Sequence, residues 1–119
     1  MGWRLSVKNG NERKRWKMEI KYGVEKNILY IYLYGEIDEY SSGKCRSKTD
    51  EIIDRCTGVK NVVFNFANVT FMDSTGIGVL LGRYKRLKKM SVPAFIQNPG
   101  TSVNKILQIS GLYEIMPKI

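Results

Sequence analysis

The sequence predicts a single α/β domain with a mixed β-sheet of about five strands and helices packed on it. The chain has 119 residues, 43% of them hydrophobic and 26% charged, which fits one globular domain with one core. Its apolar runs switch between strand-like and helix-like periods in the order ββαβαβαβ. After an initial hairpin, the strand–helix–strand crossovers of this order place neighbouring strands parallel.

The first two strands are expected to form a hairpin. Met18–Val24 and Ile28–Tyr34 are strand-like runs, and the second is rich in alternating β-branched, aliphatic and tyrosine residues. Only three residues separate the two runs, which is typical of a hairpin connection. We expect Gly35 to end the second strand.

A helix is predicted over about 41–57, begun by Ser41 or Ser42 and closed by Gly58. Three- and four-residue spacing gives it one apolar face, made of Cys45, Thr49, Ile52, Ile53 and Cys56. The two cysteines of this face lie eleven residues apart. On one helix that spacing separates them by roughly 16 Å, beyond the reach of a disulfide, so both are expected to be reduced thiols.

The nearly continuous apolar run Asn61–Phe66 predicts a central strand covered on both sides. A short loop over 68–73 and a helix over Ser74–Lys89 are expected to follow. The helix is expected to turn Ile77, Leu80, Leu81, Tyr84 and Leu87 inward. It is expected to turn Arg83, Lys85, Arg86, Lys88 and Lys89 toward solvent.

The C-terminal part predicts a strand, a helix and a last strand. Pro93–Gln97 is a short strand whose proline occupies its first position, where no N–H is needed. Ser102 is expected to cap a helix over about Val103–Ser110, whose inward residues would be Val103, Ile106, Leu107 and Ser110. Gly111 would end this helix, and 113–119 is predicted as the fifth strand.

The positive charge is concentrated before the domain. Residues 1–17 contain six basic side chains and one acidic side chain, so they hold +5 of the net charge of +9. We expect a flexible basic arm over 1–17 and the folded domain over 18–119. The arm is either absent from the natural protein, with Met18 as its start, or a contact for an acidic surface or nucleic acid. The first interpretation is favoured because no recurring aromatic and basic pattern forms a groove.

Composition excludes several function classes. The chain has no histidine, which removes Ser–His and Cys–His nucleophiles and every histidine-containing metal site. We therefore expect no catalysis, no metal and no cofactor. No apolar run approaches the ~20 residues that cross a bilayer, and the N-terminus lacks the apolar core of a secretory signal. A cytoplasmic protein is expected.

The segment from Asp73 to Gly82 concentrates the functional signals. Its glycines do not match a phosphate-binding loop: a dinucleotide fingerprint would need glycine at Leu81, and a P-loop would need lysine at Arg83. Ser74 begins the predicted helix but has no histidine to activate it. Two interpretations remain for Ser74: a helix N-cap, or an exposed hydroxyl on a surface that glycines clear for a partner and a kinase.

The segment Phe71–Lys85 resembles the signature of anti-sigma factor antagonists of the STAS family, most closely that of the sporulation antagonists of the anti-sigma-F factor. Leu33–Asp38, Val62–Phe66 and Ile109–Leu112 support the resemblance, which covers about Met18 to Ile119.

The resemblance implies a partner switch. The unphosphorylated antagonist would bind an anti-sigma factor that is also a serine kinase, and would thereby free the sigma factor. The kinase would then phosphorylate Ser74 and the complex would dissociate, until a serine phosphatase resets the cycle. The protein would be a monomer with no contact to nucleic acid or membrane. The implied partner-binding residues are Asp38, Asp73, Ser74, Thr75, Gly76, Ile77, Gly78, Gly82 and Arg83.

Two alternatives stay open: a general-stress antagonist or scaffold of the same family, and a basic nucleic-acid-binding protein. The sequence also departs from the family, whose members usually continue into a C-terminal helix beyond the position of Ile119. Either one sheet face is partly uncovered, or the arm with Trp3, Leu5 and Trp16 covers part of the domain, or the sequence is a fragment.

Overall fold

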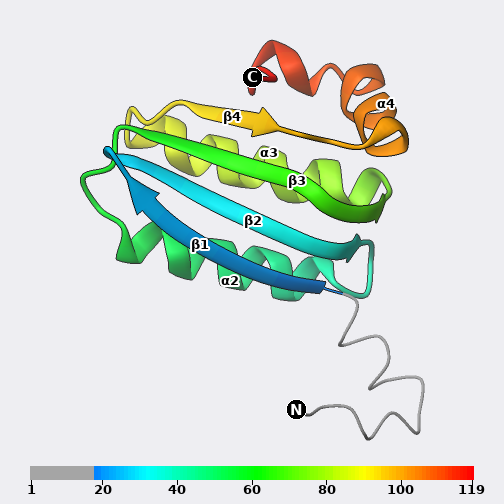
Figure 1. Cartoon of the computed structure of the whole chain (residues 1–119), viewed down its shortest axis with the longest axis horizontal. Coiled ribbons are helices and arrows are strands. Elements are labelled where there is room, and N and C mark those ends of the chain that lie inside the picture. Colours follow the sequence, from blue (N-terminus) through cyan, green and yellow to red (C-terminus); the bar gives the residue numbers. More distant parts are fainter. Residues whose placement is uncertain (1–17) are drawn as a thin grey trace, which may run out of the picture.

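A computed structural model of the chain describes residues 18–119, and the expectations for residues 1–17 lie outside this range. The described elements (Figure 1) are β1 (Met18–Glu25), β2 (Ile28–Ile37), α2 (Ser42–Arg55), β3 (Asn61–Met72), α3 (Ser74–Lys89), β4 (Ala94–Gln97), α4 (Thr101–Ile109) and the 3₁₀ turn η1 (Leu112–Glu114). Within this range no helix has the length and apolar character needed to span a membrane.

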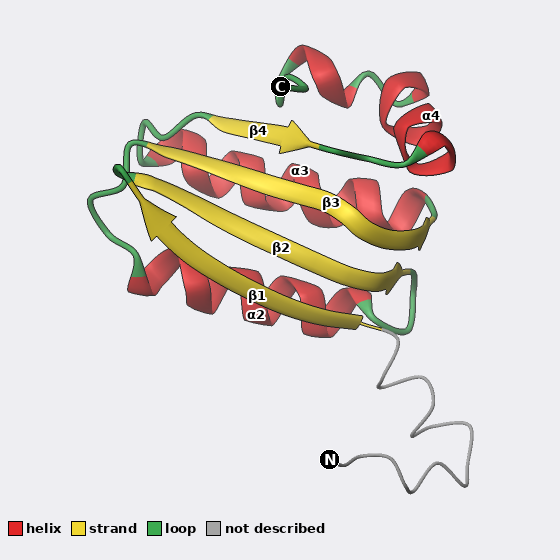
Figure 2. Ribbon diagram, in the orientation of Figure 1, coloured by secondary structure: helices red, strands yellow, loops and turns green. Residues whose placement is uncertain are grey.

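The four strands form one mixed sheet in the order β1-β2-β3-β4. β1 and β2 are the predicted antiparallel hairpin, and β2, β3 and β4 run parallel. Figure 2 shows α2 and α3 side by side behind the sheet, while α4 and η1 lie beyond β4. The expected α/β architecture with a mixed sheet is therefore present.

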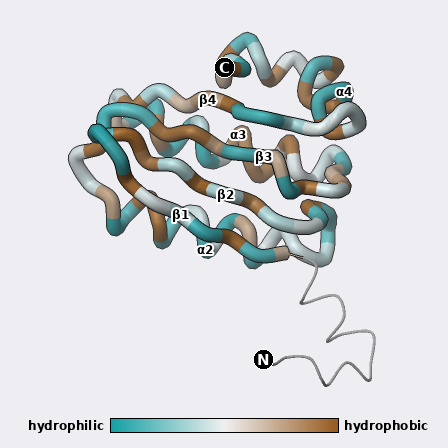
Figure 3. The backbone as a smooth tube through the Cα atoms, viewed as in Figure 1, coloured by the Kyte–Doolittle hydropathy of each residue, from teal (hydrophilic) through white to brown (hydrophobic). Residues whose placement is uncertain are grey.

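The core lies between the sheet and the two helices behind it. Leu29, Ile31 and Leu33 alternate along β2 and are almost completely buried. Five successive residues of β3, Val62–Phe66, are buried as well, which confirms the prediction of a central strand. The expected cover on both sides is not found, because among residues 18–119 helices lie over only one face of the sheet. Figure 3 shows these hydrophobic stretches along β2 and β3. The helix prediction for α2 is also confirmed, since Cys45, Thr49, Ile52 and Ile53 are buried and Cys56 is half-buried.

The prediction of a fifth strand over 113–119 is wrong. The chain forms η1 and then makes a single parallel bridge, between Lys118 and Ile96 of β4. Pro117 has no N–H to continue a ladder, although its carbonyl accepts a hydrogen bond from the Ile96 N–H at 2.9 Å. Leu112 and Met116 are both buried, and a turn brings these two side chains to the same side.

The predicted loop over 68–73 is also wrong, because β2 and β3 continue to Ile37 and Met72. The register shifts twice along this pair, between Tyr32 and Tyr34 and between Gly35 and Glu36, and each shift adds one residue on β3. Such bulges break the two-residue alternation on which the sequence prediction depends. Gly35, expected to end β2, lies inside the strand with a φ of 98°.

The helix ends are close to those predicted. α3 spans Ser74–Lys89 as expected. Gly58 and Gly111 have the positive φ typical of the residue that follows a helix. α4 begins earlier than predicted, because Gly100 and not Ser102 is its N-cap, and Ser110 is exposed and not inward.

Candidate functional site

The candidate site lies where β2 and β3 end together. Ile37 pairs with Met72, the last residue of each strand, and the Asp73 N–H donates to the Ile37 carbonyl at 3.3 Å. Asp38 and Asp73 therefore open two neighbouring turns at one edge of the sheet. The structure thus brings together two candidate residues that lie thirty-five positions apart in the sequence.

The first turn uses its own polar groups. Asp38 Oδ1 accepts hydrogen bonds from the N–H groups of Tyr40 (3.0 Å) and Ser41 (3.1 Å). The Ser41 hydroxyl accepts from the Asp38 N–H at 3.0 Å and donates to the Glu36 carbonyl at 2.7 Å. Ser41 and Ser42 are both buried. These contacts give Asp38 and Ser41 a role in holding the turn.

The second turn leaves one hydroxyl unused. Asp73 is the N-cap of α3, and its Oδ1 accepts from the Thr75 N–H at 2.9 Å. Ser74 is the first helical residue and is exposed, and its hydroxyl has no hydrogen-bond partner among residues 18–119. The interpretation of Ser74 as the N-cap is therefore wrong, because Asp73 performs that role.

The three glycines of α3 have different surroundings. Gly76 is buried, and an added Cβ would lie 2.7 Å from Met72 Sδ, closer still to Met72 Cγ, and 3.2 Å from Ile37 Cγ2. Only glycine lets the helix pack this closely on the strand ends. Gly78 and Gly82 would place a Cβ in open space. Four-residue spacing aligns Ser74, Gly78 and Gly82 along one side of α3 as a strip of accessible backbone, which we call the glycine stripe.

Two exposed aromatic residues at this edge were not predicted. Tyr40 in the Asp38 turn is 61% exposed, and Phe71, next to the end of β3, is 47% exposed. Aromatic side chains are enriched in protein interfaces. Phe71 is the first residue of the family-like segment Phe71–Lys85, but its exposure depends on the bulges of β3. No sequence signal indicated Tyr40.

Arg83 was expected on the outer face of α3, and this expectation is wrong. Its side chain is only 10% exposed, and its Nε lies 3.0 Å from Asp50 Oδ1 on α2. The contact is an ion pair and not an aligned hydrogen bond, since neither atom has a hydrogen-bond partner in the described chain. The reason is helical spacing, since Arg83 falls on the buried side of α3, which consists of Gly76, Val79, Leu80, Arg83 and Leu87. Lys85, Lys88 and Lys89 are exposed as predicted, and Arg86 is half-buried beside Asp50 and Asp54.

Residues 18–119 were also searched for metal-ligating groups and reactive cysteines. No group of three potential metal-ligating residues occurs in this range. Both cysteines are free, and burial raises the pKa of the Cys45 thiol to about 11, so this thiol stays protonated at neutral pH.

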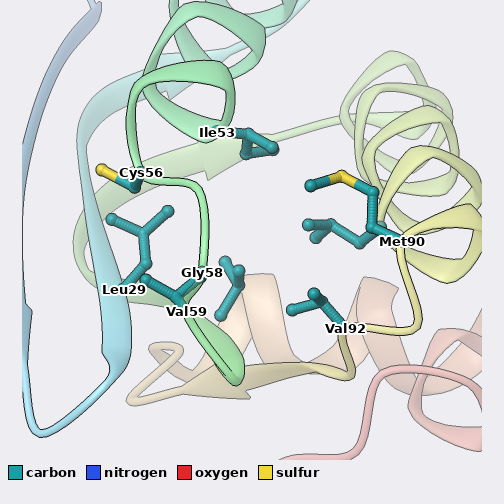
Figure 4. A pocket seen from close by; sticks show the side chains of 9 residues that line it. Leu29, Ile53, Cys56, Gly58, Val59, Met90 and Val92 are labelled. Atoms are coloured by element: carbon teal, nitrogen blue, oxygen red, sulfur yellow. The ribbon is translucent and has the colours of Figure 1, made fainter.

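An apolar pocket of about 150 Å³ lies between the C-terminal ends of α2 and α3. Figure 4 shows Ile53 and Cys56 on one side of this pocket and Met90 and Val92 on the other. It is at the end of α3 remote from Ser74. The candidate site is therefore an exposed surface and not a cavity.

Comparison with known families matches residues 16–119 to the STAS domain. An anti-sigma F factor antagonist of Paenibacillus polymyxa is 34% identical over 100 residues, covering 84% of this chain and 85% of the relative. An anti-sigma-B factor antagonist of Bacillus subtilis is 29% identical over 90 residues, covering 76% and 80%.

Two solved structures extend the comparison. The anti-sigma factor antagonist SpoIIAA in its unphosphorylated form superposes with a TM-score of 0.69 at 30% identity, over 86% of this chain and 87% of that one. The Bacillus cell fate determinant SpoIIAA in its phosphorylated form gives a TM-score of 0.62 at 29% identity, over 86% and 90%.

Proposed function

The chain belongs to the STAS domain family, and from this premise we propose that it is an anti-sigma factor antagonist that phosphorylation of Ser74 inactivates. The relatives named above are anti-sigma factor antagonists, and the related SpoIIAA exists in unphosphorylated and phosphorylated forms. In the unphosphorylated form the protein binds an anti-sigma factor that is also a serine kinase, and the sigma factor is released.

The observation that carries the proposal is the state of the Ser74 hydroxyl. It is exposed, it has no hydrogen-bond partner in residues 18–119, and it lies at the start of α3 at one end of the glycine stripe. A kinase needs a hydroxyl that it can reach without first breaking a turn. The buried Ser41 and Ser42 of the neighbouring turn do not offer one.

Phosphorylation acts mainly on the interface. A phosphate on Ser74 adds about −1.5 to −2 charges at pH 7. Within the free protein the N-terminus of α3 tolerates this charge, because the helix dipole and its free N–H groups favour anions. In the complex the same phosphate adds bulk beside the Asp73 carboxylate and must lose its hydration, so affinity for the partner falls.

The candidate residues divide into two roles in this proposal. Ser74, Ile77, Gly78 and Gly82 contact the partner directly, together with Tyr40 and Phe71. Asp38, Asp73, Thr75 and Gly76 shape the two turns that present them. Arg83 is assigned to the α2–α3 contact and not to the partner surface, because it is buried against Asp50. The exposed lysines 85, 88 and 89 steer an acidic partner.

We assign the protein to sigma-F control, with a serine phosphatase that restores the active form in the cytoplasm. The support is the higher identity to anti-sigma F factor antagonists, 34% and 33%, than to the anti-sigma-B factor antagonists at 29%. The alternative within the family is a general-stress antagonist.

The test is incubation with the candidate anti-sigma kinase and ATP, followed by mass mapping and binding titration. Phosphate is expected on Ser74, and Ser74→Ala is expected to bind without being modified. Ser74→Glu is expected to bind about 100-fold more weakly, equivalent to ~2.7 kcal/mol. Ser102→Glu is the matched control, since Ser102 is an exposed serine in the first turn of α4, and its affinity should not change. Equal affinities of Ser74→Ala and Ser74→Glu would contradict the proposal.

A further inference from the structure

One face of the sheet has no helix over it. α2 and α3 lie behind the sheet in Figure 1, and within residues 18–119 no helix crosses its front. The front carries the residues of β2 that alternate with the buried core, and their neighbours on β3 and β4. We call this surface the open face, and its apolar part consists of Ile28, Tyr30, Tyr32, Tyr34, Val63 and Phe95.

The open face is rich in aromatic side chains. The rings of Tyr30 and Tyr32 are stacked, with centroids 6.3 Å apart and planes 16° from parallel. The three tyrosines of β2 are only half-buried, unlike the core residues between them. A row of such rings offers contact area to another aromatic or aliphatic side chain.

A shallow hollow lies at one end of the open face. Its volume is about 250 Å³, and Ile28, Tyr30, Asn61, Val63, Phe95 and Ile119 line it. The walls are apolar apart from the amide of Asn61. A tryptophan side chain suits such a hollow, because its large flat ring needs apolar walls and its N–H needs one acceptor.

The β1 edge of the open face carries two glutamates and one lysine. Glu19 and Glu25 of β1 pair in register with Tyr34 and Ile28, so both belong to this face. Both are exposed, and neither forms an ion pair within the described range. The Lys21 ammonium lies 5.4 Å from the centroid of the Tyr34 ring.

Residues 1–17 have the complementary composition and sufficient reach. They hold +5 of the net charge and both tryptophans of the chain, Trp3 and Trp16. β1 starts beside Gly35, and the hollow lies about seven residues along the strand, roughly 23 Å away. Trp3 precedes Met18 by fifteen residues, a reach of up to ~50 Å when extended. Trp16 reaches only the Tyr34 end of the face.

We propose that residues 1–17 dock across the open face of this chain, with Trp3 in the hollow and basic residues beside Glu19 and Glu25. The two exposed glutamates of the β1 edge favour this occupant, because residues 1–17 hold six basic side chains and one acidic side chain. The docking does not depend on the function of Ser74, which lies on α3 behind the sheet.

Tryptophan fluorescence of the full chain tests the proposal, because both tryptophans lie in the arm. In a Trp16→Phe chain all tryptophan emission comes from Trp3. Docking predicts a blue-shifted emission and roughly threefold weaker acrylamide quenching than in the same chain in denaturant, because the ring leaves water. Folded and denatured chains with the same emission and quenching would overturn it.

Variants then locate the contact. Glu19→Lys combined with Glu25→Lys should shift Trp3 emission to the red and restore quenching, as should high salt. Glu51→Lys is the matched control, since Glu51 is an exposed glutamate of α2 on the other side of the sheet, and it should leave the emission unchanged. Tyr30→Ser should undock Trp3, whereas Tyr22→Ser, an exposed tyrosine on the opposite face of β1, should not. A blue shift that appears only on dimerisation, or that survives the double charge reversal and Tyr30→Ser, would refute intramolecular docking.

Discussion

The two turns at the ends of β2 and β3 are built from the same residue types and reach different results. Each begins with an aspartate, contains a serine at or next to a helix start, and leads into a helix behind the sheet. In the Asp38 turn the Ser41 hydroxyl is buried and makes two short hydrogen bonds to backbone groups. In the Asp73 turn the aspartate alone caps the helix, and the Ser74 hydroxyl points to solvent without a partner.

The difference shows that a serine can serve as a modification site when its turn forms without hydrogen bonds from the serine hydroxyl. The Asp38 turn depends on its serine, so a phosphate there would break the fold. The Asp73 turn satisfies its first N–H groups with the aspartate and packs through Gly76, so Ser74 is free to change charge. The free energy of unfolding should therefore respond strongly to changes at Ser41 and Gly76 and weakly to changes at Ser74.

The largest effect is expected at Gly76. Gly76→Val would force atoms into Met72 and Ile37 and should lower the free energy of unfolding by about 3 kcal/mol. Gly78→Val is the matched control, because a side chain there meets open space, and it should leave stability nearly unchanged. Urea denaturation of both variants measures the difference. If the Gly76→Val protein were as stable as the Gly78→Val protein, the packing role assigned to Gly76 would be contradicted.

Loss of the Ser41 hydroxyl should have the next largest effect. Ser41→Ala removes one hydrogen-bond partner each from the Asp38 N–H and the Glu36 carbonyl at a partly buried position, so stability should fall by about 2 kcal/mol. The same denaturation measurement checks this value. An unchanged midpoint would mean that water replaces both hydrogen bonds and that the two turns differ less than their contacts indicate.

The N-cap of α3 should contribute less. Asp73→Ala removes the bond to the Thr75 N–H and should lower stability by ~1 kcal/mol. Asp73→Asn keeps a good capping oxygen without the charge, so it should restore most of that loss. Phosphorylation of Ser74 should also lower the affinity for the partner less in the Asp73→Asn variant than in the unaltered chain. A binding titration of the two phosphorylated proteins would measure this difference.

Local patterns in the sequence predict much of the fold. The bounds of α3, the hairpin, the parallel central strand and the apolar face of α2 all follow from periods and turn residues within one segment. The extension of β2 and β3 could not be predicted, because bulges interrupt the alternation and Gly35 adopts a positive φ within a strand. The prediction of a last strand over 113–119 was wrong because Lys118 forms only a single bridge to Ile96, and not a ladder of pairs.

The candidate site was predictable only in part. The Asp73–Ser74 pair indicates a helix start from sequence alone, but it left Ser74 as either an N-cap or an exposed hydroxyl. Whether a glycine is needed for close packing in the core or exposes backbone to a partner depends on which residues of other segments surround it. Gly76 meets Met72 and Ile37, whereas Gly78 meets nothing. Burial of Arg83 likewise requires Asp50 on another helix, and no pattern within either segment shows that the two side chains lie close together.

The smallest effect is expected for Ser74→Ala, and it is the sharpest test of the comparison. The Ser74 hydroxyl has no partner in residues 18–119 and the side chain is exposed, so its removal should change the free energy of unfolding by less than about 0.5 kcal/mol. Measured against Ser41→Ala under the same conditions, the two serines should differ by more than about 1 kcal/mol. A large loss of stability in Ser74→Ala would show that the hydroxyl holds the turn, and a kinase could then reach it only by opening the start of α3.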